Sequence, residues 1–425
     1  MNQNKLNSGL ASYGMFAFPL AFLGLPLYIH LPKFYHDYFG ISLSSIGIIL
    51  FASRMFDAFL DPLLGIASDK FGLTRKKFFI IFSIGLVIFF NGYFYVPKVE
   101  SETITLCWFA ICTFFVYIFF SLLYINFYSL GLGLAHSNSL RIKISSFREF
   151  FSFLGMITAA VLPSIFIMFL NSEITAFMLY GICFGVFVFV ALFFLPTFSI
   201  NKKPVLENHT VKNYIDNLKY VFKNKSMTSL IVLFFINSLP VGITSNLFSF
   251  YVDETLKAKP STSFFLILYL LCASISAVLF SVFFKNVNKL YALFGMMSIS
   301  AIGFSFTYFL NAENSYFFYG ICVLSGIGLG GEVVILPALA AEALEDHSAF
   351  ANTFFGLWAS CTKISLAVAA GIFLPLVSNS EKYLHTIPLG FKISFFYAII
   401  PLIIKCISIA IVFSIRSKIL KGATP

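Results

Sequence analysis

Two carboxylates stand four residues apart inside a long apolar stretch, RMFDAFLDPLLGIASDK at residues 54–70. If this stretch is helical, Asp57 and Asp61 share one helix face, and Arg54 joins them from one turn earlier. Two carboxylates on one face can supply oxygen ligands to a hard cation, or share a proton. The alternative is an ion-pair network that locks helices together and binds nothing.

Further ionisable residues lie deep in other apolar stretches, at Glu332, Lys363 and Lys405. The helical rise puts Asp57, Glu332 and Lys363 about 15 to 20 Å from the nearest stretch end. Such groups are costly in a bilayer and usually face a cavity or a partner. Glu332 and Lys363 therefore join the candidate site. For Glu332 a purely structural pairing explains the position equally well, and for Lys405 pairing or snorkelling explains it better.

Membrane-spanning helices must position these charges, because 59% of the 425 residues are hydrophobic and only 11% are charged. Only helices satisfy their backbone groups in hydrocarbon without closing a barrel. The sequence predicts an all-α polytopic membrane protein with twelve transmembrane helices. The predicted spans are 12–32, 42–68, 78–97, 104–134, 147–170, 174–196, 228–251, 263–284, 290–310, 315–341, 350–377 and 391–414.

The distribution of positive charge predicts the orientation. Most of the 28 Lys and Arg residues fall in the connections on the side of the N-terminus. The positive-inside rule then places both termini in the cytoplasm, and we expect a bacterial inner membrane. The longest polar connection follows the sixth span. It divides the chain into an N-terminal six-helix bundle (1–200), a cytoplasmic linker (201–227) and a C-terminal six-helix bundle (228–425), the pseudo-symmetric arrangement of major facilitator transporters.

Several other classes of function fit poorly. All seven Cys fall in apolar segments and the six His are scattered, so we expect no disulfide, no resident metal and no cofactor. No nucleophile–base arrangement accompanies the carboxylates, so we expect no enzyme. The net charge of +10 is explained by cytoplasmic connections and does not require nucleic acid. The expected partners of a monomer are the lipid bilayer and a small-molecule solute.

The connection after the second span, GIASDKFGLTRKK at 65–77, resembles the loop signature of the major facilitator superfamily. In that superfamily the acid ends a helix and pairs with basic residues to brace the cytoplasmic gate. The resemblance implies a gate role for Asp69, Gly72, Arg75 and Lys77, although the spacing from Gly72 to Arg75 is longer than usual. The alternative is a positive-inside loop with a turn glycine.

Three segments resemble the glycoside–pentoside–hexuronide:cation symporters, the melibiose permease family. They are SRMFDAFLDPLLG (53–65), LRIKISSFREFFSFLG (140–155) and TFFGLWASCTKISLAVAAG (353–371). The resemblance implies that Asp57 and Asp61 couple Na⁺, Li⁺ or H⁺ to a solute and that Lys363 serves the joint cation and substrate region. It also places Arg141, Arg148 and Glu149 in the gate region. The family's acid in span one is missing from FPLAFLG (18–24), and its span-four acid is replaced within LLYINFYSL (122–130), where Tyr124 and Asn126 are the polar candidates.

These observations predict a secondary active transporter that couples Na⁺ or H⁺ to a sugar, glycoside or uronate by alternating access. Arg54 and Lys363 would dock an anionic solute, and Tyr124, Tyr128 and Trp358 would stack on a sugar ring, unless these aromatic rings only pack helices. A lysolipid or another amphipathic solute is the alternative cargo. A transporter-derived channel or receptor is a different class, which the lack of a repeated selectivity-filter sequence disfavours.

Overall fold

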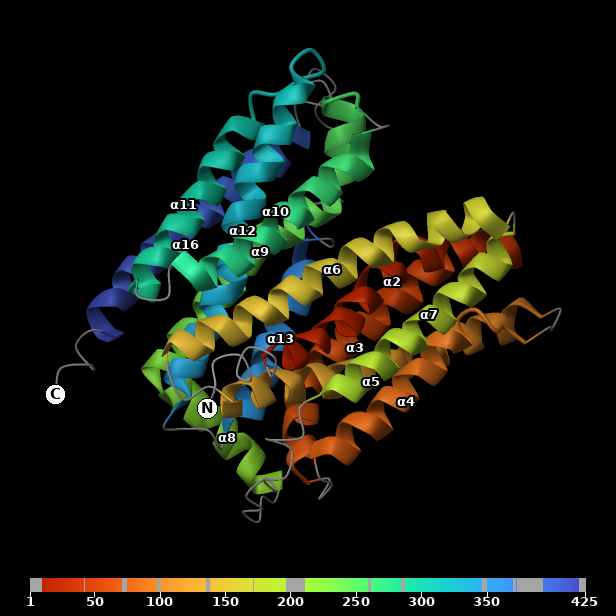
Figure 1. Ribbon diagram of the computed structural model, residues 1–425, viewed down its shortest axis with the longest axis horizontal. Coiled ribbons are helices and arrows are strands. Elements are labelled where there is room, and N and C mark those ends of the chain that lie inside the picture. Colours follow the sequence, from red (N-terminus) through yellow and green to blue (C-terminus); the bar gives the residue numbers. More distant parts are fainter. Residues whose placement is uncertain are drawn as a thin grey trace. The chain divides into compact units, whose positions relative to one another are not determined.

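The structure, a computed structural model, describes residues 10–41, 43–70, 75–97, 101–134, 138–170, 172–195, 211–258, 261–283, 287–345, 350–369, 372 and 393–419. These residues are helices and short connections, which confirms the predicted all-α class (Figure 1). The chain falls into two compact units. Unit 1 comprises Met1–His136, Phe147–Leu218 and Ser348–Ala359, and unit 2 comprises Ser137–Ser146, Lys219–His347 and Ser360–Pro425.

Unit 1 is built from long antiparallel helices that pack through their apolar sides. Helix α5 packs on both α3 and α4, and α7 packs on α2 and α4. Gly40 ends α2 in the left-handed conformation, with φ of 66°, which glycine adopts without strain. Its helices are α2 (Ala17–Phe39), α3 (Leu43–Lys70), α4 (Arg75–Gly92), α5 (Glu102–Leu134), α6 (Asn138–Leu170) and α7 (Glu173–Phe194).

Unit 2 is centred on α12, which packs along both α10 and α11, while α16 packs on α9 and α11 (Figure 1). Two π-helical turns continue helices of this unit, Tyr251–Thr255 after α9 and Phe395–Ile399 before α16. The rings of Tyr251 and Tyr397, one from each turn, stack with centroids 4.3 Å apart. The helices are α9 (Lys225–Phe250), α10 (Thr262–Phe283), α11 (Lys289–Thr307), α12 (Phe318–Ala343) and α16 (Ile400–Ile419).

Glycines let α12 approach both of its neighbours. A Cβ atom on Gly326 would lie 2.6 Å from the carbonyl oxygen of Tyr269 in α10, and one on Gly328 would lie 2.9 Å from that of Met296 in α11. Side chains at these positions would push the helices apart. Small residues of this kind bring backbones into contact in membrane proteins, where water cannot drive helix association. The close packing brings Glu332 of α12 within reach of side chains on neighbouring helices.

Every predicted span overlaps a described helix, but their ends differ. Helix α6 begins at Asn138, nine residues before the predicted start of its span, because the polar segment before Arg148 continues the helix. Eight described helices are long and apolar enough to cross a membrane, so the count of twelve remains a prediction. Helix α3, which carries Arg54, Asp57 and Asp61, is not among the eight.

Two short segments lie with the unit opposite to the predicted half. Residues 138–146, the start of α6, group with unit 2, and residues 351–359, the first half of α13 (Ala351–Val368), group with unit 1. The segment predicted as a linker contains a helix, α8 (Val211–Lys223). The predicted boundaries at 200 and 228 therefore remain a prediction.

Candidate functional site

The carboxylates of α3 lie on the inner side of the helix. Asp57 is 2% exposed and Asp61 is 0% exposed, whereas Phe56 and Phe59 of the same helix are 48% and 68% exposed. The helix thus presents aromatic side chains outward and two acids inward. A carboxylate turned inward within an apolar helix is the arrangement expected of an ion site or of a buried pair.

Asp57 is held by a hydroxyl group from α5. The Ser121 Oγ donates a hydrogen bond to Asp57 Oδ1 over 2.8 Å, and Ser121 is itself buried. A hydroxyl oxygen has lone pairs as well as a proton, so the same side chain can donate to a carboxylate or offer oxygen to a cation. Ser121 was not among the predicted site residues. The only sequence feature that could have indicated Ser121 is that it is a polar residue within an apolar span.

The first half of α13 lies directly against the backbone of α3. A Cβ atom on Gly356 would be 2.8 Å from the carbonyl oxygen of Asp61, and one on Gly65 would be 2.6 Å from that of Asn352. The two helices therefore cross with glycine on each side of the contact. This packing sets the position of the Asp61 backbone, and Pro62 follows directly within α3.

A second charged group in unit 1 is formed by neighbours in sequence on α6. The Arg148 Nε donates to Glu149 Oε1 over 2.9 Å, and the Tyr128 hydroxyl reaches the same oxygen over 3.3 Å. The Arg148 guanidinium carbon lies 3.8 Å from the centre of the Tyr128 ring, a cation–π contact. Arg148 is buried, yet among the described residues its Nη2 meets no hydrogen-bond acceptor.

Tyr124 connects this charged group with the acids of α3. Its ring lies 4.4 Å from that of Tyr128, one helical turn later on α5. Tyr124 also interacts electrostatically with Asp61, Arg148 and Glu149. Unit 1 therefore brings one of the predicted cation acids, Asp61, near two of the predicted solute aromatics. Arg148 and Glu149 were predicted for the gate, but they lie in this cluster, about ten residues inside α6.

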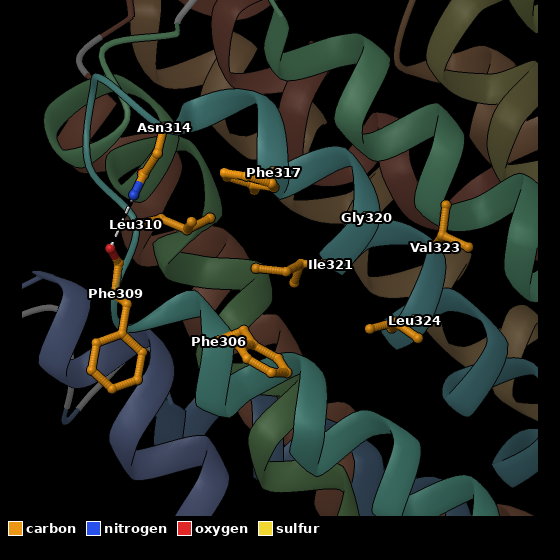
Figure 2. A pocket seen from close by; sticks show the side chains of 9 residues that line it. All are labelled: Phe306, Phe309, Leu310, Asn314, Phe317, Gly320, Ile321, Val323 and Leu324. Atoms are coloured by element: carbon orange, nitrogen blue, oxygen red, sulfur yellow. Dashed lines mark hydrogen bonds between the residues drawn. The ribbon is translucent and has the colours of Figure 1, made fainter.

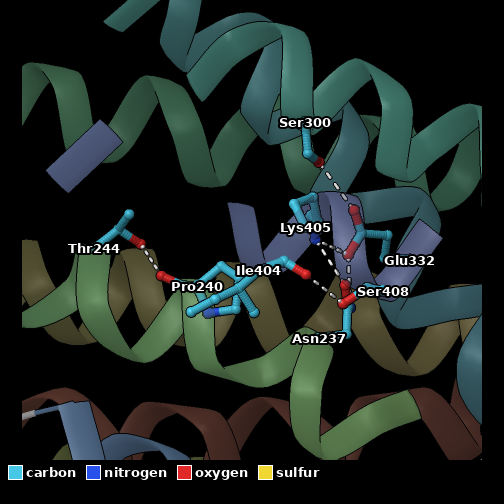
Figure 3. Close-up of polar contacts among 8 residues, drawn as sticks. All are labelled: Asn237, Pro240, Thr244, Ser300, Glu332, Ile404, Lys405 and Ser408. Carbon is cyan, nitrogen blue, oxygen red and sulfur yellow. Dashed lines mark hydrogen bonds and ion pairs between the residues drawn. The ribbon is translucent and has the colours of Figure 1, made fainter. Parts of the chain in front are cut away.

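Unit 2 holds a separate buried charge pair, drawn in Figure 3. Lys405 Nζ lies 2.6 Å from Glu332 Oε2, and both side chains are almost fully buried. Asn237 donates to the same carboxylate oxygen over 2.8 Å and accepts from Lys405 over 2.8 Å. Ser300 donates to the other oxygen, Oε1, over 2.9 Å. Four helices, α9, α11, α12 and α16, are joined through one carboxylate.

Comparison with known proteins identifies the type of molecule. The profile of the MFS/sugar transport protein family matches residues 11–419, nearly the whole chain. The chain belongs to this family. The predicted membership of the major facilitator superfamily is confirmed, as are transport and membrane location in multi-pass form. No curated protein matches the chain.

Solved structures of other major facilitator transporters share the fold of this sugar-transport family member. An outward-facing bacterial homologue of the iron transporter ferroportin superimposes with a TM-score of 0.72 at 14% identity, covering 97% of this chain and 98% of its own. A variant of the fucose:proton symporter FucP of E. coli gives 0.65 at 15% identity, over 94% and 98%. The human organic anion transporter MFSD10 gives 0.64 at 15%, over 97% and 100%. At these identities the likeness concerns the fold.

Ion pairs of this transporter also occur at helix ends in unit 2. Arg141, a predicted gate residue near the start of α6, lies 2.7 Å from Glu345 just beyond α12. Lys289 at the start of α11 lies 2.5 Å from Glu342 at the end of α12. The acids were not predicted for the gate. The sequence feature that could have indicated them is the acidic segment EALED after span ten, because acids there can pair with basic residues of the other cytoplasmic connections.

The remaining predicted gate residues are only partly described. Gly72 and the side chains of Asp69 and Arg75 lie outside the described residues. Lys77 is exposed near the start of α4. Their gate role remains a prediction.

The remaining solute candidates are found in different settings. Arg54 is half-buried one turn before Asp57, and Asn126 donates back to the Leu122 carbonyl oxygen of its own helix over 2.8 Å. Trp358 is buried, with its ring 5.9 Å from that of Phe354. Lys363 is half-buried in the part of α13 that groups with unit 2. The roles of all four remain predictions.

Proposed function

We propose that this transporter couples a cation, Na⁺ or H⁺, to the symport of a sugar, glycoside or uronate by alternating access. The observation that carries the proposal is the convergence in unit 1. Two buried acids share α3, and one of them, Asp61, interacts electrostatically with Tyr124. The ring of Tyr124 stacks beside that of Tyr128, and Tyr124 also interacts with an arginine and a glutamate of α6. A cation site and a solute site close to each other can influence one another directly.

Asp57 and Asp61 are the proposed cation residues. A hard cation prefers oxygen ligands, and the two carboxylates with the Ser121 hydroxyl supply oxygens of this kind. A proton on one carboxylate would remove the same charge. Either ion would lower the cost of the buried negative charge, and solute affinity would rise with occupancy. Reciprocity requires that solute tighten cation binding by the same factor.

The Arg148 cluster is the proposed solute region, with Tyr124 and Tyr128 as a stacking surface. The Nη2 group of Arg148 can donate to a carboxylate or hydroxyl of the solute, and Glu149 can accept from sugar hydroxyls. A uronate would meet both features, since it combines a ring with a carboxylate. This proposal moves Arg148 and Glu149 from the gate to the solute. We retain Arg54, Asn126, Trp358, Lys363 and Glu332 as further candidates.

We place the proposed gate at the helix ends that carry the ion pairs Arg141–Glu345 and Lys289–Glu342. The connection after the second span is proposed to serve the same gate, through Asp69, Gly72, Arg75 and Lys77. Positive charge in these connections favours a cytoplasmic location for them and for both termini, and the proposed membrane is a bacterial inner membrane. Glu345 is exposed and Arg141 is buried, so opening this pair would require water or another acceptor for the guanidinium. We propose a monomer in the bilayer that needs no cofactor, no resident metal and no nucleic acid.

The decisive test measures uphill uptake into proteoliposomes across a panel of sugars, uronates and lysolipids, with and without Na⁺ at two pH values. Asp57→Asn keeps the size of the side chain and removes its charge, so accumulation should disappear while exchange continues. Asp216→Asn, an exposed carboxylate in α8, is the matched control and should behave as the wild type. Unchanged accumulation in Asp57→Asn would refute the proposed cation site. Uptake of lysolipids but of no sugar or uronate would refute the proposed solute class.

A further inference from the structure

A groove runs along the surface of unit 2 between the end of α11 and the start of α12 (Figure 2). Its volume is about 650 Å³. Aromatic and aliphatic side chains form almost all of its wall. The lining residues are Phe306, Phe309, Leu310, Asn314, Phe317, Gly320, Ile321, Val323 and Leu324.

The groove lies on two candidate membrane spans, and several of its side chains face outward. Phe306, Phe309 and Phe317 are all more than half exposed. From Phe317 to Leu324 the helical rise amounts to about 10 Å, which is less than the roughly 15 Å that one leaflet contributes to the hydrocarbon core. The groove therefore falls within the depth of a single leaflet.

Water is a poor occupant of this volume. At about 30 Å³ per molecule the groove would hold roughly 20 waters, each of which needs two to four polar partners. Asn314 is the one polar side chain among the lining residues, and its groups are engaged. Its Nδ2 donates to the Phe309 carbonyl oxygen and its Oδ1 accepts from the Asn311 backbone. A hydrocarbon chain makes contacts along such a wall without leaving polar groups unpaired.

One end of the groove is polar. The Asn311 Oδ1 accepts hydrogen bonds from the backbone N–H groups of Glu313 and Asn314, which builds a tight turn. Glu313 is exposed on this turn. The polar turn lies at the end of an apolar groove, just as the polar headgroup of a lipid lies at the end of its apolar acyl chain.

We propose that this groove binds the acyl chain of a phospholipid, with the headgroup beside the Asn311–Asn314 turn. The orientation proposed above makes this a lipid of the outer leaflet. The groove shares no residue with the proposed transport site of unit 1. Its floor is open at Gly320, where an added Cβ atom would meet nothing within 4 Å.

Photolabelling in lipid nanodiscs tests the site, using phosphatidylcholine with a diazirine on its acyl chain. We expect labelled peptides that contain Phe306, Ile321 and Leu324 to exceed those from the exposed surface of α10, at Ile275 and Leu279. Equal labelling of the two surfaces would overturn the proposal. This comparison uses the wild-type chain and decides the question even if a variant fails to fold.

A pair of variants locates the chain within the groove. Gly320→Phe should fill the floor and reduce groove labelling to the level of α10. Gly295→Phe, at another position where an added Cβ atom meets nothing within 4 Å, should leave it unchanged. Undiminished labelling in a folded Gly320→Phe protein would overturn the proposal. Sugar or uronate uptake, measured in parallel, separates failure of this site from failure of the proposed transport function.

Discussion

Asp57 is buried, and one of its oxygens accepts from a hydroxyl group that has further bonding capacity. The 2.8 Å hydrogen bond from Ser121 fixes the direction of one oxygen. If a cation binds there, the hydroxyl can turn its lone pair toward the ion. Ser121 would then tune cation affinity without carrying charge.

Ser121→Ala should therefore reduce the affinity for the cation more than it reduces the stability of the protein. A hydrogen bond to a charged group contributes about 1.5 to 3 kcal/mol, so the cation concentration for half-maximal uptake should rise roughly 10- to 100-fold. Uptake measured against Na⁺ and against pH gives this value. Ser298→Ala, whose hydroxyl donates to a carbonyl oxygen of its own helix, is the control. An unchanged cation dependence would remove Ser121 from the site.

At the scale of helices, unit 2 is organised by α12 and its buried carboxylate. Glu332 accepts from Ser300, Asn237 and Lys405, which belong to three different helices. The pair is neutral as a whole and its carboxylate is fully bonded. This arrangement favours the structural explanation for Glu332 over a role in coupling, although the coupling role remains open to test.

A double substitution separates these explanations. Lys405→Met leaves the Glu332 carboxylate buried without its cation, which costs about 3 to 5 kcal/mol and should abolish folding or uptake. Adding Glu332→Gln removes that charge and should restore much of the lost stability, measured as the Tm in detergent. If Glu332 only joins helices, the folded double variant should show cation-dependent accumulation. Restored folding with lost cation dependence would return Glu332 to the coupling site.

Close packing of α12 on α10 makes a second prediction for the helices. Gly326→Ala places a methyl group within 2.6 Å of the Tyr269 carbonyl oxygen, and the backbone there cannot yield easily. We expect a loss of about 1 to 3 kcal/mol, seen as a Tm lower by several degrees. Gly320→Ala, in the same helix with open space around it, should leave the Tm unchanged. Equal Tm values for the two variants would contradict the packing argument.

At the scale of the whole molecule, alternating access requires contacts that break and re-form between the two halves of the chain. The pair of Arg141 and Glu345 joins a segment of the predicted N-terminal half to one of the C-terminal half. Lys289 and Glu342 lie within the C-terminal half. We therefore expect Arg141 and Glu345 to matter for transport.

Charge exchange tests the gate. Arg141→Glu should slow uptake strongly, because it places two negative groups together, and Arg141→Glu with Glu345→Arg should recover a large part of the rate. Because Arg141 is buried, the single variant places an unpaired carboxylate in a buried position and should lower the Tm, and the double variant should recover part of that loss. Lys257→Glu, which breaks an exposed pair with Glu254 elsewhere, is the control. Failure of the double variant to recover would argue against a pairwise gate.

Composition and residue spacing were enough to predict the class of protein, the helices and the shared face of the two acids on α3. Apolar length predicts spanning helices, and a spacing of four residues places Asp57 and Asp61 on one face whatever the tertiary structure. The deep charges Glu332 and Lys363 were also visible, because an ionisable residue stands out in an apolar stretch. Positive charge in the connections likewise predicted the orientation.

The partners of these charges, in contrast, followed from the packing of the helices. Lys405 lies 73 residues from Glu332 in the chain and Ser121 lies 64 residues from Asp57, so no local pattern relates them. Arg148 was assigned to the gate because its segment resembles that region of the symporter family, whereas α6 carries the guanidinium to the ring of Tyr128. Periodicity reports the face that a residue occupies on its own helix. The group that it meets depends on how the helices pack, which side-chain contacts far apart in sequence determine.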